Sequence, residues 1–247
     1  MNQMNVWGMT DIGLVRKENQ DAYATAQHEA SGRTVGVVCD GMGGPAGGRV
    51  ASRIAVSVYL EELEKLLTAD QDPQQLLEAS AQAVSLANQA IQAEAERREE
   101  CRNMGTTLVS AISYDAGVVV TNVGDSRAYH ISEDGITRIT KDHSLVESMV
   151  DRGDITEEEA RRHPSRNLIT RALGAEPHLA ADCFRQSLVP GDYLLLCSDG
   201  LSNVVTEQEL LYEVIHGDGA DTCCQRLLDI ALGRGAPDNV TVVLIRR

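Results

Sequence analysis

The sequence predicts an α+β fold in which antiparallel β-sheets pack face to face and helices cover the outside. Between residues 105 and 140, short segments rich in Val, Ile and Thr alternate with turn residues such as "SEDG", which is typical of antiparallel strands. The strands outnumber those of a repeating βαβ pattern, and the long helices come in pairs. Hydrophobic residues make up 43% of the 247 residues and aromatic residues only 3%, which indicates a core of Val, Leu, Ile and Ala. No low-complexity linker divides the chain, so we expect one domain over residues 1–247.

Hydrophobic periodicity predicts the elements of the first half. Apolar residues recur at helical spacing over residues 45–67 and again over 73–100, so we expect two long helices with no strand between them. A short strand is expected to open at Asp21, in "ENQDAY". The segments 105–115, 117–125, 126–132 and 135–140 then follow the period of strands and predict one antiparallel meander.

Capping signals and apolar runs predict the elements of the second half. "TEEEARR" (156–162) and "TEQELLYEVI" (206–215) each begin with a Thr that is followed three residues later by Glu, the pattern of a capping box at a helix start. An apolar strand in "DYLLLCSDG" precedes the second of these helices. A helix through "QRLLDIALG" and a final strand in "NVTVVLIRR" end the chain.

Charge and hydropathy exclude several classes of partner. The formal net charge of -15 argues against nucleic acid, because phosphate contacts need clustered Lys and Arg. No run of residues approaches the ~18 apolar residues of a membrane span, and the opening segment does not resemble a signal peptide. We therefore expect a cytoplasmic protein without a membrane partner. A monomer is expected as well, although charge and hydropathy do not bear on the oligomeric state.

The six cysteines do not indicate a zinc or iron-sulfur site, because they show neither CxxC spacing nor pairing with histidines. Cys39 and Cys197 lie in apolar runs just before aspartates, where small buried thiols are expected. A redox role for Cys223 and Cys224 is a weaker alternative.

Aspartates border the apolar strands at four positions, Asp40, Asp125, Asp199 and Asp238, and Asp21 opens another strand. Any one of them has a simple structural explanation, because Asp before Gly, Ser or Asn is a common turn former. Together they indicate a cation, because clustered carboxylates repel one another unless a cation neutralises them. An oxygen-only set of ligands suits Mg²⁺ or Mn²⁺ rather than zinc. The spacing alone leaves the metal site and the turn explanation about equally supported.

The loop in "VVCDGMGGPAGG", residues Val37 to Gly48, is mostly glycine. A phosphate-binding loop of the Walker type requires G-x-x-x-x-G-K-[ST], but here Arg49 and Val50 stand in the last two positions. That interpretation fails. The remaining one is a loop whose missing side chains let a ligand approach the backbone near Asp40, and in which Pro45 helps to start the next helix.

Eight sequence blocks in order resemble the PPM-type (type 2C) metal-dependent protein serine/threonine phosphatases, in their free-standing bacterial form. The blocks run from Gly13 to Val243 and are "GLVRKENQDAY", "VVCDGMGG", "GTTLV", "NVGDSRAY", "DHSLVESMVDRGDIT", "HPSRNLITRALG", "LLLCSDGL" and "APDNVTVV". The resemblance implies a four-layer α-β-β-α sandwich, with two antiparallel sheets flanked by helices and a metal site at one end.

The resemblance also implies roles for individual residues. Asp40 would bridge two tightly bound Mn²⁺ or Mg²⁺ ions, and the backbone carbonyl of Gly41 would bind one of them. Asp21, Asp199 and Asp238 would complete the ligands of this pair. Asp125, together with Asp199, would hold a third and weaker ion, and Asn239 would lie beside the site. Arg16 would bind the substrate phosphate, so that Arg16 and Asp40 are the expected catalytic residues.

The sequence departs from the family at the glycine loop, where members commonly carry a histidine that is a candidate general acid. The two positions concerned hold Met42 and Pro45. Water at the metals, His143 or His163 are the alternatives, and both histidines could be purely structural.

Residues 142–174 resemble the family's flap, a small helical excursion that shapes access to the metals. Its arginines Arg162, Arg166 and Arg171 could contact a phosphoprotein. Pairing with the glutamates of "TEEE" on the flap itself is at least as well supported.

The resemblance therefore predicts a protein serine/threonine phosphatase. It would hydrolyse phosphoserine and phosphothreonine in the substrates of a bacterial Ser/Thr kinase, using water activated at a binuclear metal site. A catalytically silent phosphoprotein-binding module of the same fold and a small-metabolite phosphatase are the alternatives. The complete set of aspartates, together with Arg16, favours an active enzyme.

Overall fold

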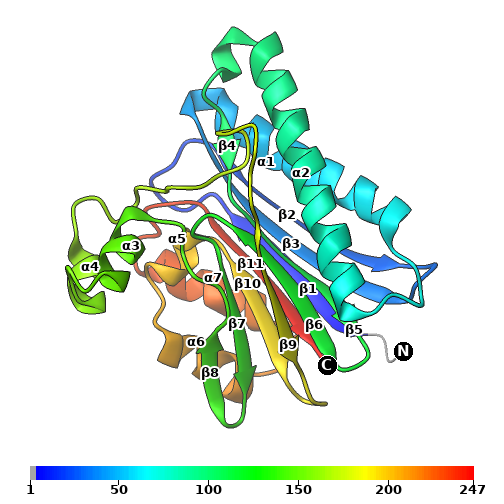
Figure 1. The fold of residues 1–247 in the computed structure, drawn as a ribbon. Coiled ribbons are helices and arrows are strands. Elements are labelled where there is room, and N and C mark those ends of the chain that lie inside the picture. The colour runs from blue at the N-terminus through cyan, green and yellow to red at the C-terminus, as the bar shows by residue number, and fades with distance from the viewer. Residues whose placement is uncertain (1–3) are drawn as a thin grey trace.

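The computed structural model describes residues 4–247 and has four layers, with two antiparallel sheets between two layers of helices (Figure 1). One sheet has the strand order β1-β11-β10-β7-β8, formed by Asn5–Asp11, Val240–Arg246, Tyr193–Cys197, Arg127–Ser132 and Gly135–Arg138. The other has the order β2-β3-β5-β6-β9, formed by Asp21–His28, Arg33–Met42, Leu108–Tyr114, Gly117–Val123 and Asp182–Ser187, and the short β4 (Gly105–Thr106) pairs with β3. The fold class expected from the sequence is confirmed.

Helices cover both outer faces. The long helices α1 (Gly44–Leu66) and α2 (Pro73–Arg97) pack on the sheet of β3, and a 3-10 turn, η1 (Glu99–Cys101), follows them. The other sheet is covered by α5 (Asp199–Ser202), α6 (Glu207–His216) and α7 (Cys223–Gly233). Two short helices, α3 (Leu145–Asp151) and α4 (Glu157–Arg162), lie to one side of the sandwich (Figure 1). Among the described residues, no helix combines the length and the apolar character that crossing a bilayer requires.

Three layers of buried side chains join these elements, and they explain why the central strands read as continuous apolar runs. In β3, Val37 and Cys39 face α1 and α2, while Val38 faces the opposite sheet. In β11, Leu244 faces α7 and Val243 faces the other sheet. Because successive side chains point to opposite faces and both faces are buried, these strands show no polar alternation.

The helix starts follow their capping signals. Capping boxes join Thr156 to Glu159 at α4 and Thr206 to Glu209 at α6, as the sequence predicted. The first predicted helix begins one residue early, at Gly44, and the second ends at Arg97, before the 3-10 turn.

Four of the cysteines, at positions 39, 197, 223 and 224, are buried, and burial raises the pKa of each thiol. This argues against the redox alternative.

The prediction of a single meander over residues 105–140 was wrong. The hairpin β5-β6 belongs to one sheet and the hairpin β7-β8 to the other. The chain crosses between the sheets at residues 124–126, where Gly124 has φ of 104° and an added Cβ would lie 2.6 Å from the Cγ2 of Thr107. The crossing therefore requires glycine, and it carries Asp125 to the end of the space between the sheets.

Two strands were not predicted. β1 and β9 carry mixed polar and apolar residues with partly exposed side chains, so their sequences lack a clear strand signal. Both are edge strands, so each pairs with a neighbouring strand on one side only.

Candidate metal and phosphate site

The five aspartates selected from the sequence converge at one end of the space between the sheets. Asp21 and Asp40 face each other in register on β2 and β3, and Gly36 and Val38 on the same side of β3 as Asp40 face the opposite sheet. Asp199 begins α5 two residues after the end of β10, and Asp238 lies two residues before the start of β11. The neighbours that raise the pKa of Asp40 are the other four aspartates of the set, Asp21, Asp199, Asp125 and Asp238.

Hydroxyl groups hold one oxygen of Asp21 and leave the other free. Its Oδ2 accepts hydrogen bonds from Ser198 Oγ at 2.8 Å and from Thr241 Oγ1 at 2.6 Å. Its Oδ1 is buried without a hydrogen-bond partner, as are the Oδ1 atoms of Asp125 and Asp199. Buried carboxylate oxygens without donors are rare in folded proteins, and these three oxygens are suited to bind a cation.

The charges of the cluster are strongly unfavourable without such a cation. Burial, with a contribution from nearby aspartates, raises the pKa of Asp21 to about 7 and that of Asp125 to about 8. Burial likewise raises the pKa of Asp40 and of Asp199. It is therefore unfavourable for these aspartates to be ionised at the same time. A divalent ion bound among them would neutralise their charges and remove this penalty.

The arrangement fits hard cations that keep part of their water shell. Among the described residues, no group of three or more Asp, Glu, His or Cys side chains is placed to hold one ion. An ion here would take one or two carboxylates and complete its coordination with water and backbone carbonyls. That ligand set is typical of Mg²⁺ and suits Mn²⁺, whereas structural zinc sites are usually built from Cys and His.

The glycine loop lets two backbone segments touch beside Asp40. A Cβ added at Gly41 would lie 2.1 Å from the carbonyl oxygen of Gly48 in α1, and one added at Gly48 would lie 2.6 Å from the carbonyl oxygen of Gly41. The carbonyl oxygen of Asp40 accepts hydrogen bonds from the Thr106 hydroxyl and the Thr107 amide, both at 2.9 Å. The loop is fixed by close packing, and a side chain at either glycine would push the start of α1 away from the cluster.

Arg16 lies at the rim of the cluster. Its guanidinium donates to Asp238 Oδ2 at 2.6 Å while the side chain remains 54% exposed. The hydrogen bond to Asp238 raises the pKa of Arg16, and the charges of Asp40 and Asp199 act in the same direction. An exposed cation beside a carboxylate cluster is available to an anionic ligand from solvent.

Asn239 holds the loop that carries Arg16. Its Oδ1 accepts from the amide of Gln20 at 2.8 Å, and its Nδ2 donates to the carbonyl oxygens of Ile12 and Glu18 at 2.9 and 3.0 Å. All the hydrogen-bonding groups of this amide side chain are therefore used within the scaffold. Asn239 lies beside the site, as the resemblance implied, and its visible role is to position residues 12–20.

His143 is bound at both ring nitrogens. Its Nδ1 accepts the amide hydrogen of Gly124 at 3.0 Å, so the neutral ring carries its proton on Nε2, which lies 3.2 Å from Asp182 Oδ2. Burial lowers the pKa of His143. His163 ends α4 and its Nδ1 accepts from the amide of Ser165. These contacts favour the structural alternative for both histidines.

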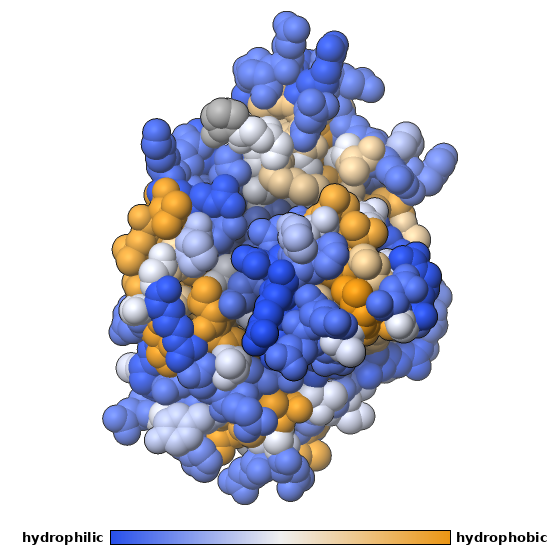
Figure 2. Space-filling view, turned by 90° about the vertical axis from the view of Figure 1, so that its left-hand side faces the viewer, coloured by the Kyte–Doolittle hydropathy of each residue, from blue (hydrophilic) through white to orange (hydrophobic). Residues whose placement is uncertain are grey.

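The flap region, defined here as residues 142–174, carries α3 and α4 and is tied to the core by ion pairs. Arg127 on β7 donates to both oxygens of Asp142 at 2.6 to 3.1 Å. Arg171 pairs with Asp182 on β9 at 2.7 Å, and Arg162 with Glu158 at 3.3 Å. Pairing with "TEEE" is thus observed for Arg162 only. The face of the molecule on this side is mainly hydrophilic with separate apolar patches (Figure 2).

Sequence reasoning missed the residues that hold the cluster. Ser198 and Thr241 bind Asp21, and the Asn203 amide donates to Asp199 Oδ2 at 3.1 Å. A signal was present, because Ser198 and Thr241 are polar residues inside otherwise apolar strand segments. In the family, a histidine is common in the glycine loop, at a position that would correspond to Met42 or Pro45 here. Pro45 lies in the first turn of α1, and Met42 lines a pocket.

The sequence is similar to known proteins over most of its length. The sequence model described as "Protein phosphatase 2C" matches residues 15–218. The serine/threonine phosphatase stp of Listeria innocua is 37% identical over 241 residues, which cover 96% of this chain and 94% of the relative.

Solved structures show the same fold. The phosphatase Stp1 from Staphylococcus aureus has a TM-score of 0.90 at 34% identity, over 99% of this chain and 95% of that one. The catalytic domain of the phosphatase PstP, solved in complex with two manganese ions, has a TM-score of 0.85 at 34% identity, over 98% of this chain and 97% of that one.

Proposed function

The chain belongs to the protein phosphatase 2C family and is a serine/threonine protein phosphatase, and we propose that its five aspartates form the divalent-metal centre that carries the reaction. The substrates would be phosphoproteins made by a Ser/Thr kinase of the same cell. The observation that carries the proposal is the set of three buried carboxylate oxygens without donors in one cluster. The manganese ions of the PstP structure support the choice of metal.

Asp21, Asp40, Asp199, Asp238 and the backbone carbonyl of Gly41 would together hold two ions. Asp125, with Asp199, would hold a third and weaker ion. When bound, a pair of divalent ions activates water as a nucleophile and neutralises charge on the phosphoryl group. The Ser198 and Thr241 hydroxyls keep Asp21 oriented, and Asn203 does the same for Asp199.

Arg16 would bind the phosphate of the substrate. Its exposed guanidinium can leave Asp238 and offer parallel N–H donors to two phosphate oxygens. Asn239 keeps the Arg16 loop against the metal site, so the phosphate would be presented to the aspartate cluster in a fixed orientation.

For Arg16→Ala we expect kcat/KM for a phosphothreonine peptide to fall by about 10- to 100-fold, the value of one charge-assisted hydrogen-bonding group. Arg16→Lys should recover only part of the loss, because an ammonium group lacks the planar fork of donors. The measurement is steady-state phosphate release at saturating Mn²⁺. Unchanged kcat/KM in Arg16→Ala would remove Arg16 from the substrate site.

Metal dependence tests the proposal as a whole. Phosphate release from an aryl phosphate and from a phosphothreonine peptide should be absent after chelation and return on titration with Mn²⁺ or Mg²⁺. The aryl phosphate reports the chemistry alone, and the peptide adds recognition of protein substrate. Folded protein that turns over neither compound with either metal would support the silent binding module, and faster turnover of small phosphometabolites than of phosphopeptides would support the metabolite phosphatase.

A further inference from the structure

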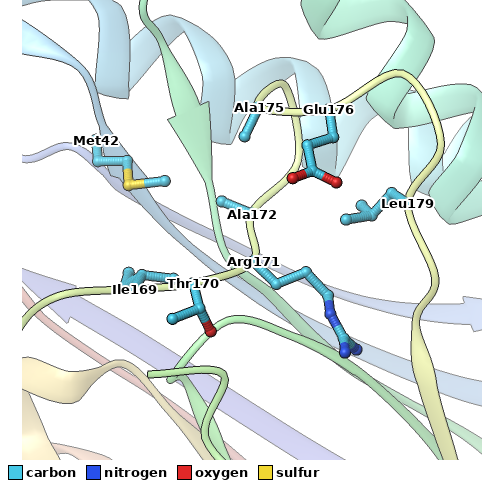
Figure 3. Close-up of a pocket in the computed structure, with 8 residues that line it drawn as sticks. All are labelled: Met42, Ile169, Thr170, Arg171, Ala172, Ala175, Glu176 and Leu179. Carbon is cyan, nitrogen blue, oxygen red and sulfur yellow. The ribbon is translucent and has the colours of Figure 1, made fainter. Parts of the chain in front are cut away.

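A small pocket lies next to the aspartate cluster, between the end of β3 and the chain that leaves the flap region. Its volume is about 90 Å³, and its lining residues are Met42, Ile169, Thr170, Arg171, Ala172, Ala175, Glu176 and Leu179. In Figure 3, Met42 from the left, Glu176 from above and Leu179 from the right point toward the space beside Ala172, while the guanidinium of Arg171 points away. The space can hold one side chain of moderate size.

The position of Met42 connects the pocket to the aspartate cluster. Asp40 and Met42 are two residues apart on β3, so their side chains leave the same side of the strand about 7 Å apart. An extended peptide advances by a similar distance every two residues. A side chain close in sequence to a phosphorylated residue bound at the cluster can therefore reach the pocket.

The wall of the pocket is held in place by hydrogen bonds from two directions. Asn88, buried on α2, accepts from the amide of Gly174 at 2.6 Å and donates to the carbonyl oxygen of Glu176 at 2.9 Å. Leu173 and Thr106 exchange backbone hydrogen bonds at 2.9 and 3.1 Å. The pocket is thus formed before any ligand binds, and the backbone of Glu176 is fixed beside it.

The charge at the pocket is unbalanced. The guanidinium of Arg171 is already paired with Asp182 at 2.7 Å. Among the side chains that the structure describes, none forms an ion pair or a hydrogen bond with the carboxylate of Glu176, which is exposed. The pocket therefore combines apolar walls from Met42, Ala172 and Leu179 with one free negative charge.

A lysine or arginine side chain matches these properties, because both residues have an apolar stem and a positive end. We propose that this pocket binds a basic side chain of the phosphoprotein substrate, located within three residues of the phosphorylated one, with its charge against Glu176. The proposal rests on the proposed function and adds a sequence preference to it. The phosphate itself would be bound at Arg16 and the metal centre, so the two recognition steps use separate groups.

The test uses phosphothreonine peptides in which Lys, Leu, Glu or Ala is placed in turn at each of the three positions on either side of the phosphothreonine. We expect one position at which Lys raises kcat/KM about three- to fivefold over Ala, the effect of one partly exposed ion pair. Glu176→Gln should remove this preference, and Glu176→Lys should transfer it to the Glu peptide. Ala175→Leu, which fills the pocket, should also reduce it.

The controls separate this proposal from the function on which it rests. Glu176→Gln should hydrolyse an aryl phosphate as the unaltered enzyme does, and an unaltered enzyme without aryl phosphatase activity would refute the proposed function instead. Glu133→Gln removes an exposed charge on the turn between β7 and β8 and should keep the Lys preference. Equal rates for Lys and Ala at every position, a preference for Leu over Lys, or loss of the preference in Glu133→Gln would overturn the assignment of the pocket.

Discussion

Asp40→Asn is expected to reduce kcat/KM for both aryl phosphate and phosphopeptide by about 1,000-fold or more. Asn has the same shape as Asp but no charge, so the proposed metal centre would lose a carboxylate ligand. Metal ions contribute several kcal/mol to such a reaction, and each 1.36 kcal/mol is a factor of ten in rate. Initial rates of phosphate release over a range of Mn²⁺ concentrations measure the effect.

Stability measurements on the same variant exclude an unfolded protein as the cause. Without metal, Asp40→Asn should melt at a higher temperature than the unaltered chain, because it removes a buried carboxylate and, with it, the repulsion from four other aspartates. The increase in melting temperature on adding Mn²⁺ should shrink. A variant that keeps both its activity and its full stabilisation by Mn²⁺ would show that Asp40 does not hold the metal pair.

The metal-free protein should become more stable as the pH falls from 8 to 6. Asp21, with a pKa of about 7, and Asp125, with a pKa of about 8, bind protons in the folded state that the unfolded chain, with pKa values near ~3.9, does not bind in this range. Stability is therefore lost as the pH rises through these folded-state values. We expect a gain of about 2–4 kcal/mol on acidification, or about 5–10 °C in melting temperature.

Saturating Mn²⁺ should reverse the sign of this dependence, because protons then compete with the metal for the same oxygens. Asp125→Asn should stabilise the metal-free protein at pH 8 by about 1–2 kcal/mol and flatten its pH profile. Asp134→Asn, on the exposed turn between β7 and β8, is the matched control and should change neither. The test is to measure the melting temperature in chelator at several pH values. A melting temperature of the metal-free protein that rises with pH would contradict the prediction.

The sequence allowed much of the fold to be predicted because the strongest signals are local. Capping boxes at Thr156 and Thr206 place α4 and α6, and apolar periodicity places α1 and α2 within a few residues. The sheet to which a strand belongs is a nonlocal property. The segment 117–132 reads as two successive strands of one meander, yet Gly124 and Asp125 carry the chain from one sheet to the other.

Part of the candidate site could also be predicted from the sequence, and part could not. The residue types in the sequence, five aspartates beside apolar strands with no Cys or His cluster, determined that any metal here would be bound by oxygen. Only the tertiary structure decided that these aspartates meet, because Asp21 and Asp40 come from one sheet while Asp199 and Asp238 flank strands of the other. It also decided which oxygens lack donors, since Ser198 and Thr241 reach Asp21 across the space between the sheets. The physical reason is that the sequence gives the type of each residue directly, whereas burial and electrostatic coupling arise only when distant segments pack together.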